Sequence, residues 1–77
     1  MGGVIITISE GLKRFRKDYT LTQRQVATAI NLAESAYQRY EYGKVIPSAN
    51  VLIDIADYFN VSLDYLAGRT NNPEINK

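Results

Sequence analysis

The sequence predicts an all-α fold in which five short helices surround one small core. Three observations support this prediction: 77 residues are too few for two domains, 45% of them are hydrophobic, and apolar residues between positions 8 and 66 recur at spacings of three and four. A chain of this length buries roughly 60% of the surface that its unfolded form exposes. Because it contains no Cys or His, disulfides and the usual zinc sites are excluded, and no metal or cofactor is expected.

Each of the first two helices begins with a capping-box signal. Thr7 and Thr22 are each followed three residues later by Glu or Gln, so that side chain and backbone can exchange hydrogen bonds at both starts. These signals predict one helix over residues 8–18 and a shorter one that ends at Asn31, a residue that tolerates a left-handed turn. The apolar faces of both helices recur at helical spacing and consist of Ile8, Leu12 and Phe15, and of Val26, Ala27 and Ile30.

The other three helices are bounded by residues that start or stop helices. The third is predicted over Ala33–Tyr42, with Gly43 behind it. The fourth begins at Pro47-Ser48 and closes at Asn60, and Ser62 caps a short last helix. Their apolar faces are Ala36, Tyr37 and Tyr40; Leu52, Ile55, Ala56 and Phe59; and Leu63 and Leu66.

The chain is expected to consist of an N-terminal arm over residues 1–7, a packed domain over 8–68 and a polar C-terminal tail over 69–77. The β-branched segment Val4 to Ile8 either lies against the core or pairs with a second subunit. Charged residues interrupt every apolar stretch before the roughly 20 residues that a membrane span needs. No membrane association and a cytoplasmic location are therefore expected.

The second and third predicted helices are joined by only about three residues, and the third has a polar face that the core does not need. This layout is typical of a helix-turn-helix. Several motifs accompany it: Leu21-Thr22-Gln23 through Ala27, Arg39-Tyr40-Glu41-x-Gly43-Lys44, Pro47-Ser48, and Val61 through Leu66. In these motifs and their spacing the chain resembles the Cro/CI-type, or XRE, helix-turn-helix family over roughly residues 8–70.

The resemblance implies a five-helix, lambda-repressor-like DNA-binding domain whose third helix enters the major groove. Four side chains project from one face of that helix, where each can reach a base edge or a phosphate: Glu34, Ser35, Gln38 and Arg39. The Arg39 guanidinium matches O6 and N7 of guanine, a pairing that discriminates by ~1–3 kcal/mol. Glu34 either accepts a hydrogen bond from a cytosine amino group or repels wrong sites. The alternative is that these residues only form a solvated helix face.

Phosphate contacts are expected from residues at the start of the second helix and the end of the third: Gln23, Arg24, Tyr42 and Lys44. Gln23 opens the second helix, where backbone N–H groups and the helix dipole favour an anion, and the resemblance implies the same role for it. Tyr42 stands where the family often carries Asn.

The resemblance also implies an ion pair between Arg16 and Glu41, which would tie the first helix to the end of the third and set the angle of the third helix. Besides Tyr42, three further residues depart from the pattern of the family: Thr20 replaces a usual glycine, Ala33 a usual Ser cap and Tyr37 a usual aliphatic residue. Tyr37 is expected to be buried with its hydroxyl at the surface, because a buried hydroxyl needs a hydrogen-bond partner.

The leading functional hypothesis is a small transcriptional regulator, in particular a repressor, that binds double-stranded DNA as a homodimer on an inverted repeat. Candidates for the subunit contact, or else ordinary isolated surface residues, are Ile53, Tyr58 and Tyr65. A second hypothesis is a protein-interaction module, because the acidic Glu34 lies on the recognition face. An enzyme is not expected, since Cys, His and a glycine-rich phosphate loop are missing. The sequence does not identify a regulatory partner protein.

The formal net charge of +1 is distributed unevenly along the chain. Seven basic and three acidic side chains lie between Lys13 and Lys44, which gives this segment a charge of +4. Residues 1–12 contribute −1 and residues 45–77 contribute −2. The segment that contains the predicted helix-turn-helix is therefore basic and the rest of the chain acidic, a polarity suited to orienting the domain on DNA.

Overall fold

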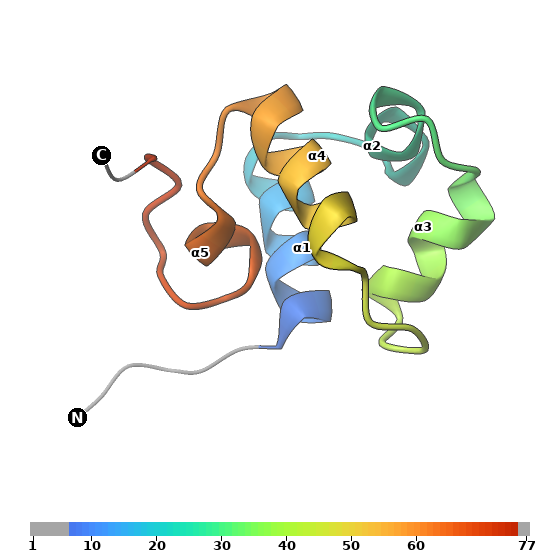
Figure 1. Cartoon of the computed structure of the whole chain (residues 1–77), viewed down its shortest axis with the longest axis horizontal. Helices are drawn as coiled ribbons and strands as arrows, with labels where there is room; N and C mark the ends of the chain where they lie inside the picture. The colour runs from blue at the N-terminus through green and yellow to red at the C-terminus, as the bar shows by residue number, and fades with distance from the viewer. Residues whose placement is uncertain (1–6, 76–77) are drawn as a thin grey trace.

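The chain folds into a series of helices joined by short loops, shown in Figure 1. The computed structural model describes residues 7–75, so the expected Val4–Ile6 part of the arm lies outside the described residues. Within residues 7–75 there are five helices and no strands, which confirms the predicted all-α class. The helices are α1 (Ile8–Asp18), α2 (Gln23–Ala29), α3 (Glu34–Glu41), α4 (Ala49–Phe59) and α5 (Leu63–Leu66).

The helix starts are set by local hydrogen bonds of the predicted kind. The Thr7 hydroxyl accepts from the backbone N–H of Glu10 at 3.2 Å, and the Glu10 carboxylate accepts from the Thr7 N–H at 3.0 Å. Thr22 and Gln25 repeat this exchange at 3.0 and 2.8 Å. Helix α3 is one residue shorter at each end than predicted, because Ala33 and Tyr42 are its caps, and Ala33 offers no side-chain hydrogen bond.

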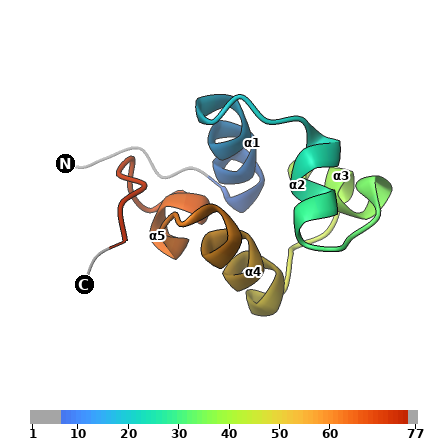
Figure 2. The same ribbon diagram turned by 90° about the horizontal axis from the view of Figure 1, so that it is seen from above.

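The core lies where the helices meet, and α1 packs against both α3 and α5. Gly11 of α1 is required at the contact with α5, because a Cβ there would lie 2.1 Å from the backbone oxygen of Leu66. Both views place α2 and α3 on one side of the molecule and α5 with the C-terminal segment on the other (Figures 1 and 2). The buried apolar side chains are Leu12, Phe15, Val26, Ala27, Tyr37, Ile55, Ala56, Val61, Tyr65 and Leu66.

Arg14 holds the segment after α5 against the body of the domain. Its guanidinium lies 4.4 Å from the ring centroid of Tyr65 and donates hydrogen bonds to the backbone oxygens of Tyr65 and Thr70 and to Asn71 Oδ1, at 2.6 to 2.7 Å. The Ser62 N–H also donates to the Pro73 oxygen at 2.9 Å. One of the basic residues of segment 13–44 therefore faces the C-terminal segment and not the helix-turn-helix.

Tyr65 was predicted as a surface residue for a subunit contact, and the structure corrects this prediction. Its side chain is 1% exposed, under the Arg14 guanidinium, and its hydroxyl donates to the Asp18 carboxylate. Burial and the hydrogen bond to Asp18 raise the pKa of the Tyr65 hydroxyl above its ordinary value of 10.0, so the group stays protonated. Tyr65 is thus a core residue that links α5 to the end of α1.

The turn between α1 and α2 contains a strained residue. Thr20, which stands where the resemblance implies a glycine, has φ +57°, a conformation that disfavours β-branched side chains. We expect Thr20→Gly to raise the free energy of unfolding by about 0.5–1 kcal/mol, because the relief of strain exceeds the entropy that Gly adds to the unfolded chain.

Urea unfolding of the two proteins measures this difference, with Thr28→Gly as the matched control. Thr28 lies inside α2 with helical geometry, so glycine there should lower stability. A loss of stability for Thr20→Gly equal to that of the control would contradict the assignment of strain to the turn.

Candidate nucleic-acid interface

Helices α2 and α3 form a compact pair joined by a four-residue turn, residues 30–33. The turn begins with Ile30, Asn31 has φ +61°, and the Leu32 N–H donates to the Ala27 oxygen at 2.8 Å. The buried side of the pair is formed by Val26 and Ala27 of α2 and by Tyr37 and Glu41 of α3. These contacts fix α3 against α2 and leave the opposite face of α3 toward solvent.

The four predicted base contacts lie on α3, outside the core. Ser35 and Arg39 are exposed, whereas Glu34 and Gln38 are half-buried. Among residues 7–75, Arg39 takes part in no ion pair, so its guanidinium is available for an external acceptor.

The predicted phosphate contacts are spread over two elements. Arg24 is on α2, Tyr42 caps the end of α3, and Lys44 follows Gly43, whose φ is +75°. The side chains of these three residues are exposed. The next two residues of the loop, Val45 and Ile46, are also exposed, Ile46 to 81%, which the sequence did not predict.

One residue predicted to contact bases is paired with one predicted to contact phosphate. Arg24 Nε donates to Glu34 Oε1 at 3.3 Å, which joins α2 to α3 across the solvent-exposed surface. Because both side chains are accessible to water, the pair adds little to stability and can open when another charge approaches.

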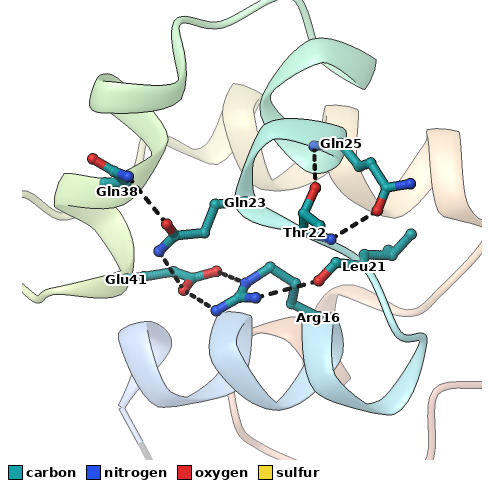
Figure 3. A network of polar contacts seen from close by, with 7 residues as sticks. All are labelled: Arg16, Leu21, Thr22, Gln23, Gln25, Gln38 and Glu41. Carbon is teal, nitrogen blue, oxygen red and sulfur yellow. Dashed lines mark hydrogen bonds and ion pairs between the residues drawn. The ribbon is translucent and has the colours of Figure 1, made fainter.

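The structure brings Arg16 and Glu41 together in a two-pronged ion pair, shown in Figure 3. Arg16 Nε donates to Glu41 Oε2 at 2.7 Å and Arg16 Nη2 donates to Glu41 Oε1 at 2.9 Å. Arg16 Nη1 also donates to the Leu21 oxygen at 3.2 Å. Since Glu41 is 1% exposed and Arg16 27% exposed, the pair bridges α1, the following loop and the last turn of α3 from a largely buried position.

Burial alone would raise the pKa of Glu41, but the hydrogen bonds that its carboxylate accepts, from Arg16 above all, outweigh burial and lower the pKa below 4.5. The hydrogen bonds between Arg16 and Glu41 raise the pKa of Arg16. Both groups are therefore charged at neutral pH.

The Tyr37 hydroxyl does not reach the surface, contrary to the sequence-based prediction. The residue is 0% exposed, and within residues 7–75 its hydroxyl makes no hydrogen bond of ordinary geometry. The hydroxyl proton still helps to lower the pKa of Glu41 at longer range, and burial raises the pKa of Tyr37 above 10.0. The interior beside α3 thus contains a neutral phenol next to a charged carboxylate.

Gln23 and Gln38 link the buried ion pair, through hydrogen bonds, to the half-buried edge of the solvent-facing side of α3. Gln23 Nε2 donates to Glu41 Oε1 at 3.1 Å, and Gln38 Nε2 donates to Gln23 Oε1 at 3.1 Å (Figure 3). The sequence predicted these two glutamines as separate DNA contacts and did not predict their hydrogen bond, because that bond depends on the angle between α2 and α3.

Two of the three residues predicted for a subunit contact remain at the surface of α4. Ile53 and Tyr58 are exposed, Tyr58 to 65%.

No helix in the described part of the chain is both long enough and apolar enough to cross a membrane.

Comparison with known proteins shows the family. Residues 12–66 match the helix-turn-helix family, so the chain belongs to that family and its resemblance to the XRE type is confirmed. It is 39% identical over 67 residues to the uncharacterized HTH-type transcriptional regulator YqaE of Bacillus subtilis, covering 87% of this chain and 58% of the relative. It is also 39% identical over 62 residues to the cryptic phage CTXphi transcriptional repressor RstR of Vibrio cholerae, covering 80% and 55%.

Among solved structures, the chain is similar to a transcriptional regulator from Listeria innocua, with a TM-score of 0.73 and 30% identity over 87% of this chain and 63% of that one. The chain thus spans little more than half the length of the two relatives named above. Those relatives are named as regulators and not as enzymes, in agreement with the sequence-based expectation.

We expect Glu41→Ala to lower the free energy of unfolding by about 3 kcal/mol, because it leaves the partly buried Arg16 without its counter-charge. Thermal and urea unfolding measure the effect. Asp54→Ala, which removes an exposed carboxylate of α4, is the matched control and should change stability by less than about 0.5 kcal/mol. Equal effects of the two substitutions would contradict a structural role for the pair.

Acid should weaken the domain through Glu41. Its pKa is lower in the folded chain than its ordinary value of 4.5, so its contribution to stability is fully present above pH 4.5 and is lost as the pH falls through the lower folded value. Urea unfolding between pH 7 and pH 3 at constant ionic strength should show a steeper loss for the native chain than for Glu41→Gln. Parallel pH profiles would show that Glu41 is not the group responsible.

Proposed function

We propose that this chain binds specific sites in double-stranded DNA as a transcriptional regulator, with α3 in the major groove and α2 across the adjacent phosphates. The observation that carries the proposal is the two-sided character of α3. Tyr37 and Glu41 are buried at 0% and 1% exposure, whereas Ser35 and Arg39 on the same helix are exposed. The buried side anchors the helix, and the exposed side carries polar groups that suit base edges.

Four side chains of α3 are proposed to face the bases, and three of them, Arg39, Ser35 and Glu34, have distinct roles; the fourth, Gln38, is proposed to contact a base as well. Arg39 pairs with guanine O6 and N7, and Ser35 donates to or accepts from a neighbouring base. Glu34 leaves Arg24 and accepts from a cytosine amino group, while it repels sites that place an acceptor there. Its exchange of partners also frees Arg24 for a phosphate.

The phosphate contacts in this proposal flank the groove. Arg24 and Lys44 supply positive charge at the two ends of the α2–α3 pair, and the Tyr42 hydroxyl donates a hydrogen bond. Gln23 uses one N–H of its amide for Glu41, so the second N–H of the same nitrogen remains to donate to a phosphate oxygen.

One α3 contacts one half-site, so we propose that a homodimer binds an inverted repeat whose half-sites are about 34 Å apart. The exposed Ile53 and Tyr58 are the proposed contacts between the subunits, and the cytoplasm is the proposed location. Because one relative is named a phage transcriptional repressor, we further propose that binding represses transcription.

A second candidate function is a protein-binding module. It is favoured by the acidic Glu34 at the start of α3 and by the exposed apolar residues that follow the end of this helix, Tyr42, Val45 and Ile46. Salt dependence separates the two functions. Phosphate binding predicts that log affinity falls steeply with log salt concentration, whereas an apolar protein interface responds weakly.

The proposal is tested by selecting bound sequences from a random duplex pool at fixed salt, followed by affinity measurements on the selected site. We expect an inverted repeat to be enriched. Arg39→Ala should weaken binding by about 1–3 kcal/mol and relax the preference at one base pair of each half-site.

Lys44→Ala serves as the comparison, because it should weaken binding to all sequences alike and reduce the salt slope by about one. Failure to enrich any site, or a loss of base preference with Lys44→Ala and none with Arg39→Ala, would contradict the proposed arrangement.

A further inference from the structure

We propose that the buried Glu41 sets the base preference of α3, by fixing the direction of the hydrogen-bond chain from Glu41 through Gln23 to Gln38 so that Gln38 selects adenine. This inference rests on the proposed function and adds a specific base and two positioning residues to it. The three side chains belong to α2 and α3 and lie in continuous hydrogen-bond contact, as Figure 3 shows.

The direction of these hydrogen bonds is set first by the charge of Glu41. Its carboxylate is held ionised by Arg16, and an ionised carboxylate can only accept hydrogen bonds. Gln23 must therefore turn its NH2 group, and not its oxygen, toward Glu41, as the 3.1 Å contact from Nε2 to Oε1 shows. The amide of Gln23 has no freedom to reverse without placing two oxygens against each other.

The orientation of Gln23 then determines that of Gln38. Because Gln23 Oε1 lies at the far end of its amide and can only accept, Gln38 must present its own NH2 group, at 3.1 Å. One N–H of Gln38 Nε2 is used in this contact. The groups of Gln38 that remain are its second N–H and its Oε1, which points away from Gln23 in Figure 3.

One remaining donor and one remaining acceptor match one base in the major groove. Adenine offers N7 as an acceptor and the N6 amino group as a donor, so it satisfies both groups of Gln38. Guanine offers two acceptors, O6 and N7, and would place O6 against Gln38 Oε1. Cytosine and thymine each satisfy one of the two groups. A glutamine held in this orientation therefore prefers adenine and rejects guanine.

Glu41 and Gln23 are positioning residues in this proposal, since neither touches the base. Their effect differs from that of a purely structural residue, which would weaken binding to every sequence alike. Loss of this hydrogen-bond network should instead reduce discrimination at the base pair that Gln38 contacts. The preference at the base pair that Arg39 contacts should stay unchanged.

The first experiment measures affinities of the native chain and of Gln38→Ala for duplexes altered at each base pair of the selected half-site. Gln38→Ala identifies the base pair concerned, where the native chain should prefer adenine by about 5- to 150-fold. Two base analogues test the contact: 7-deazaadenine lacks N7, and purine lacks the amino group. Either one in place of that adenine should weaken binding. A preference for another base there, or no effect of either analogue, would overturn the inference.

The second experiment repeats these measurements with Glu41→Gln and Gln23→Ala. The amide that Glu41→Gln introduces can donate as well as accept, so the hydrogen bonds from position 41 through Gln23 to Gln38 lose their fixed direction. The preference for adenine should therefore fall by about 2- to 12-fold. Gln23→Ala should have a similar effect and decides the question if Glu41→Gln does not fold, as thermal melting would show. Thr28→Ala, on the exposed side of α2, is the control and should keep the native preference.

The outcomes separate this inference from the function on which it rests. If the native chain enriches no DNA site, the proposed function fails and the inference with it. If a site is enriched and Gln38→Ala alters one base pair, but Gln23→Ala keeps the full adenine preference, the proposed function stands and the positioning role is wrong.

Discussion

The arrangement of this domain depends on one buried carboxylate, that of Glu41. It lies in the last turn of α3, accepts two hydrogen bonds from Arg16 of α1, and is 1% exposed. A buried charge is tolerable only with a well-placed counter-charge, so the geometry of α3 relative to α1 is constrained by electrostatics as well as by packing. The Tyr37 side chain, one turn earlier, adds an apolar contact on the same face.

The same carboxylate connects the interior to the surface. Through Gln23 it reaches Gln38 in two hydrogen bonds, so the polar group nearest the core and a polar group on the exposed side belong to one network. By contrast, the Arg24–Glu34 pair is exposed and contributes little to rigidity. The α3 surface thus combines a half-buried side chain with a fixed orientation and exposed side chains, such as Arg39, that are free to adapt.

Much of the fold could be predicted from the sequence because its signals are local. Capping boxes act within four residues, and they placed the starts of α1 and α2 correctly. The prediction for Tyr65 is wrong because helical periodicity does not show that Arg14 of α1 lies over the Tyr65 ring, where the backbone oxygens of Tyr65 and Thr70 hold its guanidinium. The hydrogen bond between Gln23 and Gln38 could not be predicted from the sequence either, because it depends on how α2 and α3 pack.

In the proposed complex, the exposed side of α3, held by Glu41, is the surface that meets DNA. The most direct measurement is a nuclear magnetic resonance titration of the isotope-labelled chain with its selected duplex. We expect chemical-shift changes to concentrate on Gln23, on residues 34–39 and on Lys44, and the signals of α5 to stay unchanged. Shifts confined to α4, around Ile53 and Tyr58, with none on α3, would contradict it.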